Sequence, residues 1–184
     1  MKETELIAVN ARDYQIIDRH LNVSAIVRAT DESLMIGEFP AGQIIQCGGP
    51  ELLEACVKLN GCKVGEAKIT KGYGSGSFDY VIHTVDPRYV ENAGNRKDLL
   101  ASCYRACLRI AIENNIRSIA FPSISTVYKD NYDNNPIPLK EAVEVAVPTV
   151  KRFTMEHVGE IDVIKWVLYD DVTFSAYMHE ISLF

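Results

Sequence analysis

Short unbroken apolar runs alternate along the chain with longer segments in which apolar side chains recur every three or four residues. The short runs are typical of buried parallel strands, and the longer segments are typical of amphipathic helices. Strands are therefore expected near residues 6–9, 24–27, 66–70, 80–85, 119–121 and 163–169, and helices near residues 49–61, 98–114, 139–156 and 172–181. This alternation predicts an α/β fold, a three-layer α/β/α sandwich with a central mixed, mostly parallel sheet.

The run Ile119–Phe121 is the strand around which a functional site is expected. Pro122 cannot donate a hydrogen bond to a neighbouring strand, so the sheet should end there. Ser123, Ser125 and Thr126 then follow at the carboxyl end of a central strand. Open α/β sheets bind their ligands at that edge.

The connecting segments carry turn residues rather than a recognisable ligand motif. The glycines of residues 72–77 do not have phosphate-loop spacing, so this stretch is expected to join the two strands beside it as a hairpin. Residues 30–48 read as a loop leading into a short helix, and residues 127–138 as a polar loop. Pro148 falls inside a helical pattern and is expected to kink it.

Composition limits the classes of protein that fit. A chain of 184 residues suits a single domain over residues 1–184. The net charge of -6, without a basic run, speaks against bulk nucleic-acid binding, although backbone N–H groups can still hold a local anion. Five cysteines without metal-ligand spacing, and no leading apolar signal segment, predict a reduced, cytoplasmic protein with no metal or cofactor. No apolar stretch reaches the roughly 20 residues of a membrane helix.

Residues with reactive side chains are expected to be structural. His83 lies in the middle of a strand, and Cys103 and Cys107 share one face of a helix. Free cysteine usually packs as a small buried apolar residue. No spacing supports a Ser/His/Asp or Cys/His arrangement, so catalytic residues are left unassigned.

Several segments, in the right order, resemble the macro domain family, whose members bind ADP-ribose and sometimes hydrolyse its derivatives. The resemblance is carried by Gly49-Pro50-Glu51-Leu52-Leu53, Gly65-Glu66-Ala67-Lys68-Ile69-Thr70, Tyr80-Val81-Ile82-His83-Thr84-Val85 and Ile116-Arg117-Ser118-Ile119-Ala120-Phe121-Pro122-Ser123-Ile124-Ser125-Thr126. It implies a macro domain-like fold with a ligand cleft at the strand ends.

The resemblance assigns residues to the base and ribose of such a ligand. Asp13, with Tyr14 beside it, falls where the family recognises the adenine amino group, and Tyr169 falls where an aromatic side chain faces adenine. Arg28 and Asp31 replace two asparagines of catalytic members. The Arg28 guanidinium is expected either to turn into the cleft or to pair with Asp31.

The resemblance also shows that the phosphate-binding segments differ. Residues 36–45 lack most of the family's glycines, and Ala41 and Ile45 stand where catalytic members have Asp and His. Losing a general acid or base typically costs about 10²–10⁴-fold in rate. Asp31 and Glu38 would border the phosphates, where a carboxylate at ~6 Å is repelled by roughly 3 kcal/mol at an effective dielectric of ~20.

The loop after residue 121 carries the last implied contacts. Ser125-Thr126-Val127-Tyr128 lacks the family's glycine, and Tyr128 is placed to stack on a ribose. The expected ligand-binding residues are Asp13, Tyr14, Asp31, Ser123, Ser125, Thr126, Val127, Tyr128 and Tyr169.

Three functions fit these residues. The first is a module that binds ADP-ribose or a related adenine nucleotide with weak or no hydrolysis, an ADP-ribosylated protein being a further candidate partner. The second is a hydrolase of ADP-ribosyl or O-acetyl-ADP-ribose esters, although the family's catalytic Asn, Asp and Gly positions are not matched. The third is a scaffold that has lost ADP-ribose and binds another ligand or a protein, with the cleft filled by side chains such as Phe39 or Tyr128.

Overall fold

One mixed sheet of six strands runs through the computed structural model, which describes residues 2–12, 21–35, 39–74, 78–91, 94–126 and 136–184. The strands are β1 (Glu5–Asn10), β2 (Ala25–Thr30), β3 (Ala67–Lys71), β4 (Tyr80–Val85), β5 (Ser118–Phe121) and β6 (Val163–Leu168). Their order is β1-β6-β5-β2-β4-β3, and every pair of neighbours is parallel except β3 and β4. The expected hairpin is therefore confirmed as the antiparallel edge of a mostly parallel sheet.

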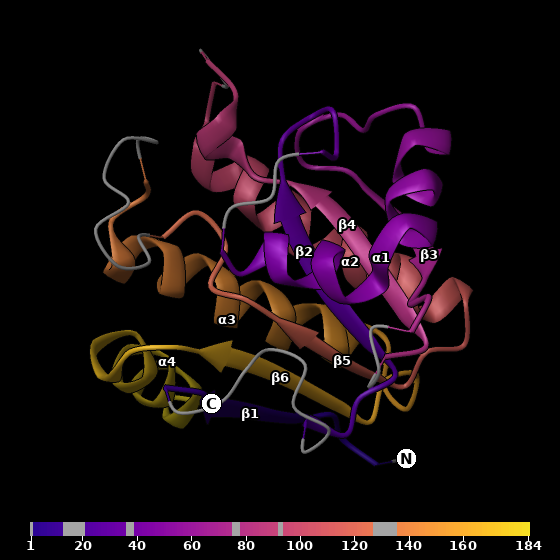
Figure 1. Ribbon diagram of the computed structural model, residues 1–184. Coiled ribbons are helices and arrows are strands. Elements are labelled where there is room, and N and C mark those ends of the chain that lie inside the picture. Colours follow the sequence, from indigo (N-terminus) through magenta and orange to yellow (C-terminus); the bar gives the residue numbers. More distant parts are fainter. Residues whose placement is uncertain (1, 13–20, 36–38, 75–77, 92–93, 127–135) are drawn as a thin grey trace.

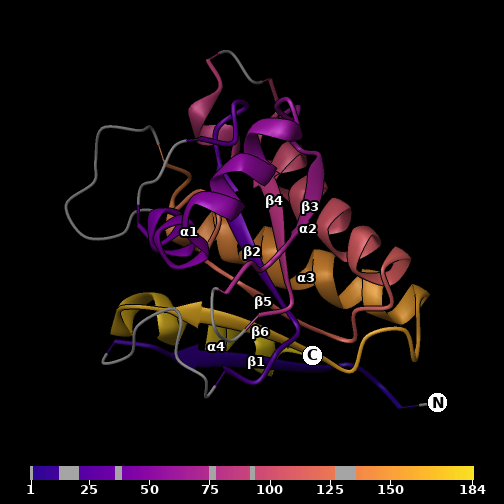
Figure 2. The same ribbon diagram turned by 45° about the vertical axis from the view of Figure 1, so that its right-hand side comes forward.

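Helices cover both faces of this sheet (Figures 1 and 2). The helices are α1 (Ala41–Lys58), α2 (Arg96–Glu113), α3 (Leu139–Glu156) and α4 (Asp171–Ser182), with a short 3₁₀ turn η2 (Pro87–Tyr89) after β4. α1 packs on one face, and α2, α3 and α4 contribute to the core on the other. The predicted three-layer α/β/α sandwich is confirmed. None of the helices within the described residues is long and apolar enough to cross a membrane.

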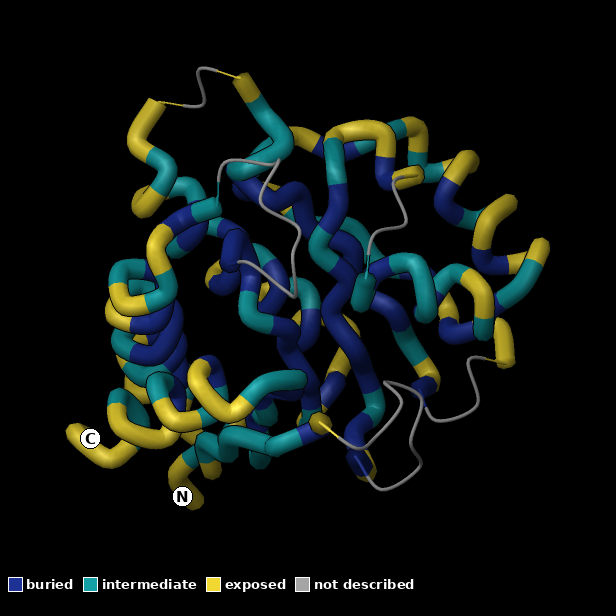
Figure 3. The backbone as a smooth tube through the Cα atoms, turned by 60° about the vertical axis from the view of Figure 1, so that its left-hand side comes forward, coloured by how far each residue is buried: buried dark blue, intermediate teal, exposed yellow. Residues whose placement is uncertain are grey.

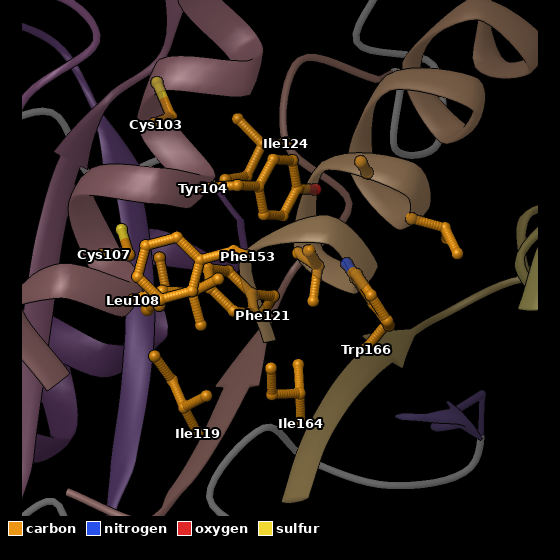
Figure 4. Close-up of a cluster of buried hydrophobic side chains, with 14 of the residues drawn as sticks. Cys103, Tyr104, Cys107, Leu108, Ile119, Phe121, Ile124, Phe153, Ile164 and Trp166 are labelled. Carbon is orange, nitrogen blue, oxygen red and sulfur yellow. The ribbon is translucent and has the colours of Figure 1, made fainter. Parts of the chain in front are cut away.

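The larger core lies between the sheet and α2, α3 and α4, and it is centred on aromatic side chains (Figure 4). The Tyr104 ring centroid lies 5.0 Å from that of Phe121, and Trp166 lies 5.4 Å from Tyr177. Cys103 and Cys107 pack beside them, fully buried, as expected of apolar packing residues. All five cysteines carry free thiols. Burying each large apolar side chain contributes roughly 1.5–3 kcal/mol, so this layer is a major source of the stability of the sheet.

The smaller core lies under α1, where alternate residues of the strands point to the opposite face. Within α1 the helical conformation breaks at Gly49, which has φ 62°, and Pro50 follows. At Gly48 an added Cβ would lie 2.4 Å from Cδ2 of Leu52, so only glycine fits there. The expected short helix before Gly49 is therefore present as the first part of α1, and it begins at the ligand edge.

Burial decreases from the middle of the sheet to the outer sides of the helices (Figure 3). The ends of β2, β5 and β6 meet at one edge because all three strands are parallel. β5 ends at Phe121, directly before Pro122, as the sequence predicted. The start of α1 and the turn η2 lie at the same edge, where they border a cleft.

Candidate functional site

The cleft lies at the carboxyl ends of β2, β5 and β6. Its lining includes Arg28, Phe39, Arg88, Ser123, Thr126 and Tyr169. The cavity volume is about 50 Å³, whereas one water needs ~10–15 Å³ on the same scale. The cleft as it stands thus admits a few waters, and a nucleotide requires its walls to move.

Arg28 forms a buried anchor for the segment between β2 and α1. The side chain is fully buried. Its Nη1 donates to the Leu34 carbonyl oxygen at 2.7 Å, and its Nε donates to the Ala41 carbonyl oxygen at 3.3 Å. Burial lowers the pKa of Arg28, and the carboxylate of Asp31 opposes that shift. The carbonyl oxygens of Leu34 and Ala41 therefore point toward the Arg28 cation. The family resemblance instead implies that backbone N–H groups before α1 surround a diphosphate.

His83 supports Arg28 from the neighbouring strand. Nδ1 of His83 lies 3.4 Å from Nη1 of Arg28, and Nε2 lies 2.9 Å from the Thr70 hydroxyl. Burial, and secondarily the Arg28 charge, lowers the pKa of His83 to about 3. The ring is neutral near pH 7, so the predicted structural role of His83 is confirmed.

Cys56 is the thiol nearest to this histidine, and it is not activated. Its Sγ lies 3.9 Å from Nε2 of His83, a nitrogen already in contact with Thr70. Burial raises the pKa of the Cys56 thiol, whereas a catalytic cysteine needs a lowered pKa. The pair does not form a nucleophilic Cys/His dyad.

Phe39 and Tyr169 meet within the cleft. Their ring centroids are 4.8 Å apart and the ring planes are inclined by 77°, an edge-to-face arrangement. Phe39 stands just before α1 and Tyr169 just after β6, and both are half-buried. The hypothesis of a self-filled cleft predicted a side chain in this place, and its other candidate, Tyr128, lies outside the described residues.

Asp86 holds the loop that follows β5. Its buried carboxylate accepts hydrogen bonds from the Ser125 backbone N–H at 3.0 Å and from the Ser125 hydroxyl. Ser125 has φ 64°, a conformation that costs non-glycine residues energy unless the surroundings stabilise it. Asp86 supplies that stabilisation through these two hydrogen bonds.

Arg88 completes this network from η2. It forms an ion pair with Asp86 at 3.2 Å, and its side chain is only 10% exposed. Its Nη1 donates to the Thr126 carbonyl oxygen at 3.2 Å, and its guanidinium lies 4.8 Å from the centre of the Tyr89 ring. Neither Asp86 nor Arg88 is among the ligand-binding residues expected from the sequence.

The structure brings together part of the predicted ligand set. Ser123, Thr126 and Tyr169 line the cleft, and the Thr126 hydroxyl donates to that of Ser123 at 2.8 Å. Ser125 does not line the cleft, because it is buried and hydrogen-bonded to Asp86. The Asp31 carboxylate instead accepts from the Ser33 hydroxyl at 2.7 Å and does not line the cleft. Four further predicted residues lie outside the described residues: Asp13, Tyr14, Val127 and Tyr128.

The start of α4 borders the cleft but is already capped. The Asp170 carboxylate accepts from the Thr173 N–H at 2.7 Å, which satisfies a donor that an anionic ligand would otherwise use. Within the part of the chain that the structure describes, no group of three or more His, Cys, Asp or Glu side chains could hold a metal ion. The cleft can therefore offer a ligand aromatic packing and hydroxyl hydrogen bonds, whereas the guanidinium groups of Arg28 and Arg88 are bonded within the protein.

Comparison with known proteins shows which family of proteins this chain is similar to. A family model described as Macro domain matches residues 27–146. A macro domain-containing protein of Chlorobaculum tepidum is 40% identical over 163 residues, which are 88% of this chain and 90% of that protein. The ADP-ribose glycohydrolase MACROD2 of Homo sapiens is 40% identical over 89% of this chain, and the match spans 37% of that longer protein.

A solved structure agrees with the sequence comparison. The macrodomain of Trypanosoma brucei, in complex with ADP-ribose, superposes with a TM-score of 0.77 at 32% identity. The superposition covers 97% of this chain and 68% of that one. The similarity therefore extends beyond the matched family model to β1, β6 and α4.

Proposed function

The chain belongs to the macro domain family, and on that premise we propose that its cleft binds ADP-ribose or a related adenine nucleotide with weak or no hydrolysis. The observation that carries the proposal is the position of Tyr169, a half-buried aromatic ring beside the hydroxyls of Ser123 and Thr126 at the carboxyl edge of the sheet. An aromatic ring beside hydroxyl groups suits a base and a ribose. The Trypanosoma brucei relative, solved with ADP-ribose, supports this choice of ligand.

The proposed contacts divide between the two ends of the ligand. Tyr169 packs on the adenine ring, where base–aromatic stacking is typically worth about 1–3 kcal/mol. The hydroxyl oxygens of Ser123 and Thr126 accept hydrogen bonds from the ribose hydroxyls. Asp13, as the family resemblance implies, recognises the adenine amino group, and Tyr14, Asp31, Ser125, Val127 and Tyr128 remain proposed neighbours of the ligand.

Weak or absent hydrolysis follows from the side chains near the cleft. Ala41 and Ile45 occupy the places of the family's catalytic Asp and His, and neither can accept a proton. Arg28, which replaces an asparagine, donates to the chain's own carbonyl groups. Without these family side chains, a bound water would have to be positioned by the substrate.

We further propose that residues 1–184 form a single domain and that the protein works in the cytoplasm. β1, from the start of the chain, pairs with β6, from its end, which supports one domain. The five free thiols fit a reducing compartment. An ADP-ribosylated protein would present the same nucleotide to the cleft and is the proposed macromolecular partner.

A second candidate function, a scaffold that no longer binds ADP-ribose, is favoured by the contact of Phe39 with Tyr169. This contact leaves a cavity of about 50 Å³. In that case residues 31–45 and 127–138, which differ from the family pattern, would recognise another small molecule or a protein. This function predicts that mixing the protein with adenine nucleotides produces no heat of binding, whereas the first function predicts a measurable heat.

Calorimetry with ADP-ribose at millimolar concentration tests the proposed function. The wild-type protein should release or absorb measurable heat, and Tyr169→Ala should weaken binding about tenfold because the base loses its aromatic contact. Tyr73→Ala, which removes an exposed ring from the β3–β4 connection, is the matched control and should bind as the wild type does. Absence of heat and of a thermal shift in the wild type would contradict the proposal.

The same samples distinguish binding from hydrolysis. An ADP-ribosyl ester incubated with the purified protein should remain intact, because Ala41 and Ile45 replace the family's Asp and His and the Asp86 carboxylate in the cleft is already bonded to Ser125 and Arg88. Steady turnover of that ester by the wild type, with no turnover by Tyr169→Ala, would instead indicate that the protein is a hydrolase.

A further inference from the structure

We infer, on the basis of the proposed function, that Phe39 competes with the base of the ligand for Tyr169, so that the cleft binds a nucleotide only after the Phe39 ring withdraws. Both rings line the same cleft, and their centroids are 4.8 Å apart. Aromatic rings in direct contact have centroids roughly 4.5–7 Å apart, so no third ring fits between these two. A base therefore cannot pack on the side of Tyr169 that Phe39 contacts while Phe39 is in place.

The position of Phe39 is imposed by the sheet through Arg28. Leu34 and Ala41 stand on either side of Phe39 in the sequence, and the carbonyl oxygens of both accept hydrogen bonds from Arg28. Arg28 is fully buried and is contacted in turn by His83 on β4. Arg28 therefore holds the backbone at Ala41, two residues after Phe39, and the Phe39 ring lies edge-to-face with Tyr169.

Withdrawal of the ring does not require the core to open. Phe39 and Tyr169 are each half-buried, whereas the core aromatics behind the sheet are fully buried. A ligand therefore has to replace the contact of Phe39 with Tyr169, and its apparent affinity is reduced by the fraction of molecules in which Phe39 occupies the cleft. Removing the ring should tighten binding about tenfold.

Competition of this kind depends on the base and not on the phosphate. An aromatic ring on Tyr169 blocks adenosine 5′-monophosphate and ADP-ribose alike, because both carry adenine. Ribose 5-phosphate has no base and can use only Ser123, Thr126 and neighbouring groups. Its affinity should therefore be independent of Phe39.

Calorimetric titrations of wild type, Phe39→Ala and Phe39→Tyr with these three ligands test the inference. We expect Phe39→Ala to bind the two adenine ligands about tenfold more tightly than the wild type does, and to bind ribose 5-phosphate equally well. Phe39→Tyr keeps a ring of similar size and should stay within twofold of the wild type for every ligand. A thermal melt of each variant verifies that it is folded.

The outcomes separate the two proposals. Equal affinity of wild type and Phe39→Ala for the adenine ligands would overturn the competition while leaving the proposed function intact. Absence of adenine binding in both proteins would overturn the competition together with the proposed function. A gain of the same size for ribose 5-phosphate would also overturn it, because a general widening of the cleft, and not release of Tyr169, would then explain the result.

A ligand-independent measurement checks the contact itself. Tyrosines labelled with fluorine give a ¹⁹F resonance for Tyr169 that Tyr169→Phe identifies by its loss. Phe39→Ala should shift this resonance, because a neighbouring aromatic ring has been removed. An unchanged resonance would show that the rings do not meet in solution and would overturn the inference.

Discussion

Arg28 and His83 stand opposite each other on β2 and β4, with Nη1 of the arginine 3.4 Å from Nδ1 of the histidine. Arginine has only donors, so Nδ1 of His83 must accept. The ring proton therefore sits on Nε2 and is donated to the Thr70 hydroxyl at 2.9 Å. This neutral tautomer orients the guanidinium that fixes the segment beside the cleft.

The neutral His83 makes folding stability depend on pH. In the unfolded chain a histidine takes up a proton below about pH 6.5, whereas folded His83 stays neutral down to a pKa of about 3. The stabilisation is present above pH 6.5 and is lost as the pH falls from 6.5 toward 3. We predict that His83 accounts for about 2 kcal/mol of the stability lost between pH 7.5 and 5.

Denaturant unfolding at those two pH values measures this loss. His83→Gln should show a smaller decrease than the wild type, whatever its stability at pH 7.5. His179→Gln alters an exposed histidine at the end of α4 and serves as the control. Identical pH dependence of wild type and His83→Gln would contradict the buried neutral ring.

Arg28 should contribute to stability through the two carbonyl groups it satisfies. Arg28→Met keeps much of the volume but leaves the oxygens of Leu34 and Ala41 without this donor, and each buried unpaired acceptor costs about 1–3 kcal/mol. We predict a loss of roughly 2–4 kcal/mol in the free energy of unfolding. Arg117→Met, which breaks an exposed pair with Asp162, should cost much less, because surface ion pairs contribute little to stability. Equal losses in the two variants would refute the anchoring role of Arg28.

Asp86 should control the order of the loop after β5. Asp86→Ala removes the acceptor for the Ser125 N–H and hydroxyl and leaves Arg88 without its buried partner, so we predict a loss of about 3 kcal/mol. Amide hydrogen exchange at Ser125 should accelerate more than exchange in β5. Asp98→Ala, an exposed change at the start of α2, provides the comparison. Unchanged protection of Ser125 would show that the loop holds its shape by other means.

The sequence predicted the framework because local patterns determine it. An unbroken apolar run ended by Pro122 located β5, and helical periodicity located α2 and α3. The strand pattern placed Ser123, and the family resemblance placed Tyr169, at one edge of the sheet, and the structure puts both in the cleft. Each of these features depends on residues near one another in the chain or on a motif of several residues.

The polar network around the cleft could not be predicted in the same way. Asp86 and Ser125 are 39 positions apart, and no local pattern pairs them. For Arg28 the sequence left two orientations open, and the structure shows it bound to carbonyl groups of its own loop. Such contacts depend on where loops pass one another in space, which a single sequence does not reveal.

The central claim is that a macro domain cleft still accepts adenine nucleotides although its phosphate-binding segments have been rebuilt. An amide-resolved NMR titration of the wild-type protein with ADP-ribose tests it most directly. The account predicts saturable shifts at Ser123, Thr126, Tyr169 and Asp170, with the amides of α2 and α3 unmoved. A spectrum unchanged at millimolar ADP-ribose, or shifts confined to another face, would contradict it.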